Sequence, residues 1–108
     1  MAQIPSEVID IVNKYVEIIK NDVKIEKVIL YGSYAKGNYN EKSDIDLALI
    51  ISGYNSNDFI NMGTFLLDKS FVLKADLQPF PFSIEEYNNP KGIMEEVLNT
   101  GIELQIAA

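Results

Sequence analysis

Apolar residues near the start of the chain recur at helical spacing. They recur at spacings of three and four positions: Val8, Val12, Tyr15, Val16 and Ile19. Residues at these intervals lie on one face of an α-helix, so the pattern predicts an amphipathic helix from Ser6 to Lys20. We expect Ser6 to cap this helix and Glu7 to stabilise its first turn.

Three short apolar runs predict β-strands. They are Lys27–Tyr31 (KVILY), Asp44–Ile51 (DIDLALII) and Phe71–Leu77 (FVLKADL). Each run is rich in large apolar residues and has the length of a strand rather than of a helix. The third run is expected to end at a turn marked by Pro79 and Pro81.

Two helices are predicted in the second half of the chain before residue 90. The first runs from Ser56 to about Lys69, and Gly63 weakens it because glycine is a poor helix former. The second is short and starts at Ser83, since Ser83 and Glu86 have the spacing of a capping box.

Two further elements are predicted near the end of the chain. A helix from Pro90 to Asn99 is followed by Gly101, which we expect to end it in the left-handed conformation. The alternating segment Ile102–Ile106 predicts an edge strand. Together the elements predict a single α/β (α+β) domain over residues 1–108, with a small mixed β-sheet flanked by helices. Four phenylalanines are expected in the core and two aromatic residues at an interaction surface: Phe59, Phe65, Phe71 and Phe80, then Phe82 and Tyr87.

The composition narrows the chemistry that such a domain can perform. The chain has 108 residues and a net charge of −7, from nine lysines against sixteen Asp and Glu residues. It contains no arginine, histidine, cysteine or tryptophan. Zinc sites built on its own cysteine or histidine, cysteine nucleophiles and Ser-His-Asp triads are therefore excluded. Carboxylates, hydroxyls, lysines, backbone groups and an oxygen-bound metal remain.

The same numbers limit the expected partners and location. Hydrophobic residues make up 47% of the chain, which is typical of a soluble globular protein. An acidic chain without a basic run is not expected to bind DNA directly. No stretch approaches the ~20 apolar residues of a membrane span, and no signal peptide is predicted. We therefore expect a cytoplasmic protein with no membrane association.

The segment from Tyr31 to Leu49 carries the candidate chemistry. Asp44 and Asp46 lie two positions apart at the start of a predicted strand, so their side chains are expected on one face. Two adjacent carboxylates repel each other unless a cation lies between them. Mg²⁺ is the expected cation, because it binds one or two carboxylates together with substrate phosphates.

A glycine–serine turn supplies the complementary half of this site. Gly32 allows the backbone to approach a phosphate, and the Ser33 hydroxyl adds a donor. Lys36 and Lys42 are the nearest cations and are candidates for phosphate contacts. A P-loop is excluded although two glycines have the right separation, because Asn38 and a tyrosine stand where Lys and Ser or Thr are required. The turn and the carboxylates together predict a site for a nucleoside triphosphate with its metal.

This pattern resembles the signature of the DNA polymerase β-like nucleotidyltransferase superfamily. The matching residues are Gly32, Ser33, Gly37 and the run Ser43-Asp44-Ile45-Asp46-Leu47. The short length points to its minimal nucleotidyltransferase (MNT) branch. The resemblance implies the nucleotidyltransferase fold and two Mg²⁺ ions held by the aspartate pair and a third carboxylate. The matching third position is Asp76, which is also the best candidate to accept a proton from the acceptor hydroxyl.

The resemblance also implies a reaction and a partner. The expected activity is transfer of a nucleoside monophosphate, AMP from ATP, to a hydroxyl group. Within the MNT branch it implies a pairing with an all-helical HEPN protein, in which the MNT chain is the antitoxin and a tyrosine of the toxin is the acceptor. The alternative is a non-catalytic nucleotide- or protein-binding partner that neutralises a toxin by occlusion.

Ordinary structural roles stay open for each candidate residue. The three aspartates can be solvated carboxylates, and Ser33 can be a turn residue that bonds its own backbone. Lys36 and Lys42 can be solvated surface lysines. Tyr34 and Tyr39 could stack on a nucleobase, although loop tyrosines are common.

Overall fold

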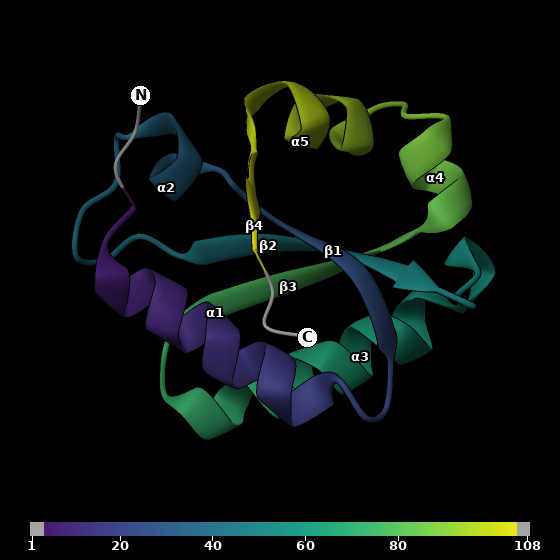
Figure 1. Cartoon of the computed structure of the whole chain (residues 1–108), viewed down its shortest axis with the longest axis horizontal. Helices are drawn as coiled ribbons and strands as arrows, with labels where there is room; N and C mark the ends of the chain where they lie inside the picture. The colour runs from purple at the N-terminus through teal and green to yellow at the C-terminus, as the bar shows by residue number, and fades with distance from the viewer. Residues whose placement is uncertain (1–3, 106–108) are drawn as a thin grey trace.

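Within residues 4–105, which the structure describes, four strands form one mixed β-sheet with helices on both faces (Figure 1). The structure is a computed structural model. The strands lie in the order β3-β2-β1-β4. Strand β2 is antiparallel to β1 and parallel to β3, and β4 is antiparallel to β1. Their bounds are β1 Lys24–Tyr31, β2 Ile45–Ser52, β3 Leu77–Ser83 and β4 Ile102–Leu104.

Helices α1 and α3 cover one face of the sheet, and α4 and α5 lie on the other (Figure 1). The short helix α2 follows β1, and 3₁₀ turns η1 and η2 precede and follow α3. The bounds of the helical segments are α1 Ser6–Ile19, α2 Ser33–Lys36, η1 Ser56–Asp58, α3 Phe59–Ser70, η2 Phe71–Leu73, α4 Ile84–Asn88 and α5 Ile93–Thr100. The predicted α/β class with a small mixed sheet is therefore confirmed.

The central strand β2 is buried on both faces. Leu47 and Leu49 pack into the core formed with α1 and α3. Ala48 and Ile50 point the other way and belong to a smaller core that also contains Val97 of α5. A strand covered on both sides carries an unbroken apolar run instead of an alternating one, which explains the sequence of this segment.

A buried hydrogen bond joins the two helices of the larger core. The hydroxyl of Tyr15 in α1 donates to the backbone carbonyl of Leu66 in α3 over 2.6 Å. Tyr15 is fully buried, so this bond satisfies its hydroxyl group where water cannot reach it. It fixes the position of α3 against α1.

The prediction of a strand at Phe71–Leu77 is wrong. Phe71–Leu73 forms the turn η2, Lys74 has a positive φ of 54°, and the strand begins only at Leu77. Pro79 and Pro81 lie inside this strand instead of ending it. Pro79 and Pro81 are two residues apart, so the N–H groups that they lack would both point to the same side of the strand. Since β3 is at the edge of the sheet, one side of it has no partner strand and needs no such donors. The intervening residues remain able to pair with β2.

The shifted strand also changes which aromatic residues are buried. The predicted core position of Phe71 is wrong, because 70% of its surface is exposed. The predicted surface position of Phe82 is also wrong, because Phe82 is buried in the same core as Ala48 and Met94. The reason is the position of the strand along the chain, since residue 71 lies in a surface turn before β3 and residue 82 lies within β3.

The predicted helix ends are partly confirmed. The capping box is present: Glu86 N–H donates to Ser83 Oγ, and Ser83 N–H donates to the Glu86 carboxylate. Ser6 does not cap α1, because it is the first helical residue and Pro5 occupies the N-cap position. Gly101 is extended, with φ −83°, so it does not end α5 in the left-handed conformation.

The predicted edge strand at the end of the chain is confirmed as β4, which pairs with β1, while Ile106 lies outside the described residues. No helix in the described part of the chain has the length and apolar character needed to cross a membrane.

Candidate functional site

The predicted site residues lie at one end of the sheet, where the strands begin or end; we call this end the site edge. Strand β1 ends there at Tyr31, and because β2 is antiparallel to β1 and parallel to β3, both of those strands begin there. Asp46 is paired with Tyr31 on one side and with Gln78 on the other. The backbone N–H of Ile45 donates to the carbonyl of Asp76 over 2.7 Å. The topology thus brings together residues 31–46 and 76–78.

Gly32 connects the two halves of the predicted motif directly. Its backbone has φ 72° and ψ −148°, a region that is essentially restricted to glycine. A Cβ atom at this position would overlap Asp46 Oδ2 and lie 3.2 Å from Asp46 Cγ. The glycine is therefore required both by its backbone conformation and by the carboxylate that lies against it.

Asp44 and Asp46 are electrostatically coupled. Asp46 is half-buried near the start of β2, and Asp44 is exposed immediately before that strand. Burial raises the pKa of the Asp46 carboxyl above its usual value, and the negative charge of Asp44 raises it further. A carboxylate pair held in this way favours a bound cation, because a cation relieves both effects.

A hydrogen-bonded turn holds the chain that leads into the aspartate pair. The backbone N–H of Asn40 donates to Ser43 Oγ over 2.9 Å, and the N–H of Ser43 donates back to the Asn40 carbonyl over 3.0 Å. The N–H of Lys42 donates to Asn40 Oδ1 over 2.8 Å. These bonds give Ser43 a structural role, which is to set the direction in which Asp44 enters the site.

Ser33 is half-buried at the first position of α2, directly after Gly32. The first N–H groups of a helix have no partner within it, so they are available to an anion at this edge. The carbonyl of Ser33 accepts hydrogen bonds from the N–H groups of Gly37 and Asn38. Gly37 ends the helix in the left-handed conformation, with φ 81°.

The two predicted lysines differ in their surroundings. Lys36 Nζ is 3.8 Å from a Glu96 carboxylate oxygen, and both side chains are exposed. Lys42 is exposed on the loop before Asp44. Tyr34 and Tyr39 stack on each other with ring centroids 4.5 Å apart, so one face of each ring is already covered.

Asp76 lies at the same edge as the aspartate pair but is not gathered with it. It is exposed and immediately precedes β3. Asp76 is two positions before Gln78, which is the strand partner of Asp46. No group of three acidic side chains among residues 4–105 is arranged to hold a metal ion. The third ligand therefore stays a prediction from the family resemblance.

Two residues at this edge were missed by the sequence analysis. Tyr31 lies opposite Asp46 in the strand pairing, and burial together with the charges of Asp46 and Glu96 raises its pKa to about 12. Glu96 comes from α5, some fifty residues away along the chain, so no local pattern could place it here. Tyr31 could have been found, because it directly precedes Gly32.

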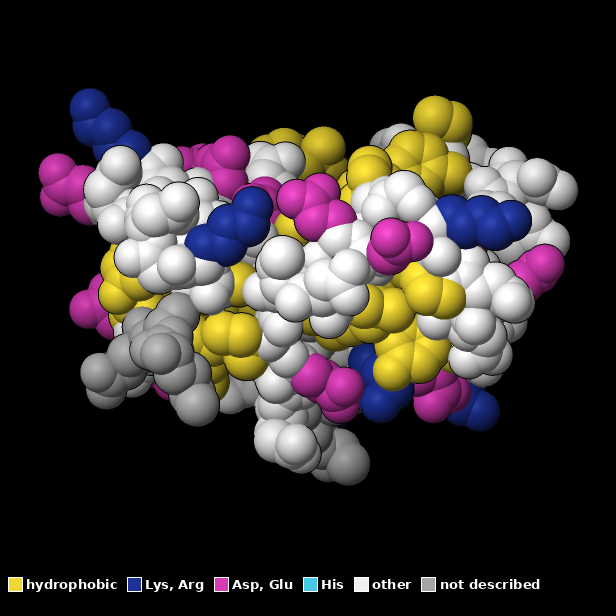
Figure 2. Space-filling model, turned by 90° about the horizontal axis from the view of Figure 1, so that it is seen from above, with side chains coloured by type: hydrophobic (Ala, Val, Ile, Leu, Met, Phe, Trp, Pro, Cys, Tyr) yellow, Lys and Arg dark blue, Asp and Glu magenta, His cyan; other side chains and the backbone are white. Residues whose placement is uncertain are grey.

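The surface around the site carries no gathered basic patch on the face that Figure 2 shows. Seen from the side of α4 and α5, acidic side chains, scattered lysines and apolar patches are intermingled (Figure 2). Phosphate binding at this edge would therefore depend on individual lysines and backbone groups rather than on a basic surface.

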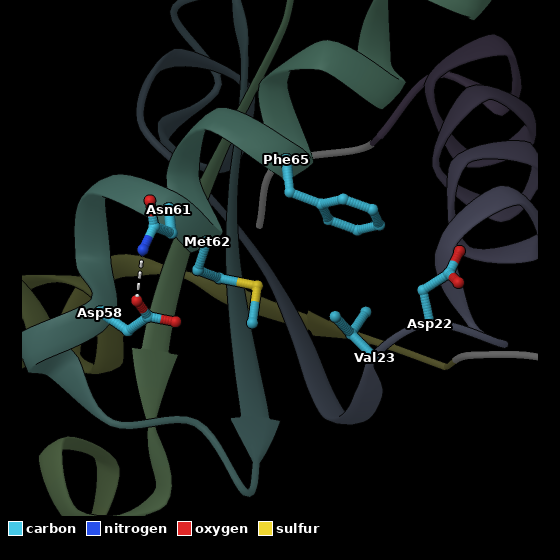
Figure 3. Close-up of a pocket in the computed structure, with 6 residues that line it drawn as sticks. All are labelled: Asp22, Val23, Asp58, Asn61, Met62 and Phe65. Carbon is cyan, nitrogen blue, oxygen red and sulfur yellow. Dashed lines mark hydrogen bonds between the residues drawn. The ribbon is translucent and has the colours of Figure 1, made fainter.

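A separate hollow lies at the opposite end of the sheet. It has a volume of about 240 Å³, and Val23, Met62 and Phe65 form its apolar part. Asp22 stands on one rim near the end of α1, and Asp58 stands on the other, where it accepts a hydrogen bond of 2.8 Å from Asn61 (Figure 3). The hollow contains none of the residues that the sequence predicts for the site.

The fold and this edge define a nucleotidyltransferase domain. Residues 13–106 match the family described as "Polymerase beta, Nucleotidyltransferase". Since the match spans most of the chain, the chain belongs to this family, and the predicted MNT membership is confirmed.

Several relatives come from Methanocaldococcus jannaschii. A protein provisionally named protein adenylyltransferase MJ1379 is 35% identical over 77 residues, which are 67% of this chain and 74% of that protein. Another with the same provisional activity, MJ1215, is 25% identical over 99 residues, or 92% of this chain and 84% of that protein. The general kind of protein predicted, a nucleotidyltransferase, is thus confirmed.

Solved structures share the fold at low identity. A provisionally assigned nucleotidyltransferase from Sulfolobus solfataricus has a TM-score of 0.67 at 16% identity, covering 91% of this chain and 79% of that one. A chain of a toxin–antitoxin crystal structure with AMP-PNP has a TM-score of 0.55 at 19% identity, covering 88% and 73%. A chain of the toxin–antitoxin MntA-HpeT has a TM-score of 0.53 at 19% identity, covering 88% and 72%. These likenesses concern the fold.

Proposed function

We propose that this chain transfers AMP from ATP to a hydroxyl group of a partner protein, a tyrosine of a HEPN-type toxin, and thereby acts as its antitoxin in the cytoplasm. The observation that carries the proposal is the contact between Gly32 and the Asp46 carboxylate. It joins a phosphate-binding turn to a coupled carboxylate pair in one place. The relatives' provisional name, protein adenylyltransferase, supports the choice of AMP and of a protein acceptor.

In this proposal the triphosphate lies on the turn after β1. The backbone at Gly32 and Ser33 and the Ser33 hydroxyl bind its oxygens, since a glycine lets a phosphate come close to the main chain. Lys42 is exposed beside Asp44 and adds positive charge. Lys36 does the same once its exposed contact with Glu96 opens, and such a surface pair is weak.

Asp44 and Asp46 are the residues that fit a Mg²⁺ ion, because their charges oppose each other in the absence of a cation. Asp76 completes the predicted set for two ions. Bound Mg²⁺ would supply charge neutralisation for the triphosphate and for the leaving pyrophosphate. The chain's own part is to hold the carboxylates at the edge where β2 and β3 begin.

The reaction itself is an in-line displacement at the α-phosphorus. The acceptor oxygen forms a bond to this phosphorus, the bond from the phosphorus to the oxygen bridging to the β-phosphate breaks, and pyrophosphate leaves with the electron pair. The acceptor proton passes to the carboxylate of Asp76, which is exposed.

Labelled ATP tests the proposal. The chain is incubated with ATP labelled at the α-phosphate, Mg²⁺ and the protein encoded beside it, and label on that protein is measured. Wild type should transfer label, and Asp46→Asn should lose at least about 100-fold of the rate. Asp22→Asn is the matched control, because Asp22 lies at the opposite end of the sheet, and it should retain activity.

The second candidate is neutralisation by occlusion, without catalysis. It is favoured by one observation, namely that no three acidic side chains in the described part of the chain form a metal-binding group. Wild type would then bind and inhibit the toxin without transferring label, and Asp46→Asn would inhibit equally well. Chelation of Mg²⁺ with EDTA separates the two as well, because occlusion should survive it.

A further inference from the structure

An apolar stripe runs along the solvent-facing side of α3. Its members are spaced by three or four residues, so they lie on one face of the helix, and η2 continues it: Ile60, Gly63, Thr64, Leu67 and Phe71. Ile60 and Phe71 have 74% and 70% of their surface exposed. Val72 next to Phe71 is exposed as well. Contiguous exposed apolar side chains of this size mark an interaction site.

A groove accompanies this stripe. It lies between α3 and the edge strand β3 and has a volume of about 270 Å³. Phe59, Ile60 and Leu67 line it from the helix, while Pro79 and Pro81 line it from the strand. A Cβ atom added at Gly63 would have nothing within 4 Å, so the helix backbone is open to a close approach there.

The edge of the sheet excludes one kind of occupant. A strand added to β3 would need backbone N–H donors along its free edge. Pro79 and Pro81 have no N–H, and their spacing of two puts both gaps on the same side of the strand. An element that binds through its side chains, such as an amphipathic helix, needs no such donors. The groove therefore fits a helix better than a strand.

The negative charge of the chain favours a different protein over a second copy of this chain as the occupant of the groove. The chain has a net charge of −7, and a second copy would bring the same charge. Asp68 is exposed next to Leu67, and none of the ion pairs found among residues 4–105 involves it. A basic partner would gain from both features, whereas a self-contact would be opposed by repulsion.

The direction of the stripe links it to the site. Since α3 connects the end of β2 to the start of β3, its C-terminal end and η2 lie where β3 begins. Phe71, the last residue of the stripe, and its exposed neighbour Val72 are thus close along the chain to Asp76. A helix lying in the groove would bring one of its ends to the edge that holds the aspartates.

We propose that the groove between α3 and β3 binds an amphipathic helix of a basic partner protein and that this contact presents the partner's acceptor hydroxyl to the Asp44–Asp46 edge. The second half of this inference rests on the function proposed above. The contact itself does not, because it follows from the exposed stripe, the proline edge and the charge.

The experiment compares matched substitutions on the two faces of the sheet. Ile60→Asp and Leu67→Asp place charge in the groove, and Ile93→Asp places it on α5, where Ile93 is also exposed. Circular dichroism and thermal unfolding should show three folded proteins, because all three sites face solvent. The affinity for the co-expressed protein encoded beside this chain should fall at least about 30-fold for each groove variant. Ile93→Asp should change it less than about threefold.

Photo-cross-linking identifies the occupant. A benzoylphenylalanine introduced at position 60 of the full chain should cross-link to a lysine- or arginine-rich helix of the co-expressed protein, and one at position 93 should not. A cross-link from position 60 to a second copy of this chain overturns the proposal. The proposal is also overturned if a complex forms without a cross-link at position 60, or if no complex forms at all.

The two proposals fail in different ways. If wild type transfers label and both groove variants transfer it equally well, the groove proposal is wrong and the transferase function stands. If the groove variants lose binding while wild type transfers no label, the transferase function is wrong and the groove proposal stands.

Discussion

Gly32 and Asp46 lie against each other, and the Asp46 carboxylate fills the space that a side chain at position 32 would need. Gly32 directly follows β1 as the N-cap of α2, and Asp46 lies near the start of β2, paired with Tyr31. This relationship explains why the two parts of the motif occur together. A larger residue at position 32 would displace the carboxylate on which the proposed chemistry depends.

Gly32→Ala is therefore expected to disturb the carboxylate and the backbone at once. The positive φ of 72° strains any residue with a Cβ, by about 1–3 kcal/mol. Overlap with the Asp46 carboxylate adds a cost of similar size, because the carboxylate must move. Urea unfolding should show the loss of stability, and the label-transfer assay should show little activity.

Gly53→Ala is the matched control for that substitution. Gly53 also has a positive φ, 76°, but a Cβ atom there would meet nothing within 4 Å. The variant should lose roughly 1–2 kcal/mol of stability from its backbone and keep its activity. Equal loss of activity in both variants would show that stability, and not the position of Asp46, limits the reaction.

Asp46→Asn is expected to change stability and activity in opposite directions. The folded pKa of Asp46 lies above 3.8, so the folded chain binds more protons than the unfolded chain in that window. Stability from this group therefore falls as pH rises from about 3.8 through the folded pKa, and the penalty persists at pH 7. The variant should be more stable at pH 7 by less than about 1 kcal/mol, because solvent screens a half-exposed group.

Urea unfolding from pH 4 to pH 8 checks this prediction. The gain of Asp46→Asn should be small near pH 4 and should reach a plateau at higher pH. Asp44→Asn removes the second cause of the raised pKa and should give a smaller gain of the same sign. A variant less stable than wild type at pH 7 would contradict the electrostatic description of the pair.

The elements with a strong local pattern could be predicted from the sequence. The helix α1 follows from its apolar spacing, β2 from its continuous apolar run, and α4 from the capping box at Ser83 and Glu86. Local interactions decide these elements, so the sequence nearby is sufficient. The motif at Gly32 and Asp46 was found for a related reason, since it lies within a single stretch.

The misplaced strand depended on tertiary structure instead. FVLKADL reads as a strand, yet Phe71–Leu73 turns at the surface, and the proline-containing segment Leu77–Ser83 pairs with β2. Prolines disfavour a strand only where their N–H would be needed, and the sequence does not reveal that β3 is an edge. The contribution of Glu96 to the site was likewise invisible, because α5 reaches this edge only through the fold.

Tyr15→Phe is expected to weaken the contact between α1 and α3 and to reduce the alkaline instability of the chain. At pH 7 the variant loses the hydrogen bond to the Leu66 carbonyl, at a cost of about 1 kcal/mol. Burial raises the pKa of Tyr15 well above its usual value of 10.0. The folded chain therefore keeps a proton that the unfolded chain loses above pH 10, and stability falls as pH rises there. Urea unfolding at pH 7 and pH 10.5 should show the difference between variant and wild type shrinking at the higher pH.

Gly101→Ala and Gly63→Ala are expected to change stability with opposite sign. Gly101 has an ordinary φ of −83°, so backbone strain plays no part. A Cβ atom there would lie 2.5 Å from the Val97 carbonyl oxygen and 2.6 Å from Ile29 Cγ2, and separating these groups should cost about 1–3 kcal/mol. Gly63 lies inside α3 with open space around it, so alanine should stabilise the chain by about 0.5–1 kcal/mol. Thermal unfolding of both variants measures the two shifts, and a neutral Gly101→Ala would mean that Gly101 packs less closely against α5 and β1 than the structure shows.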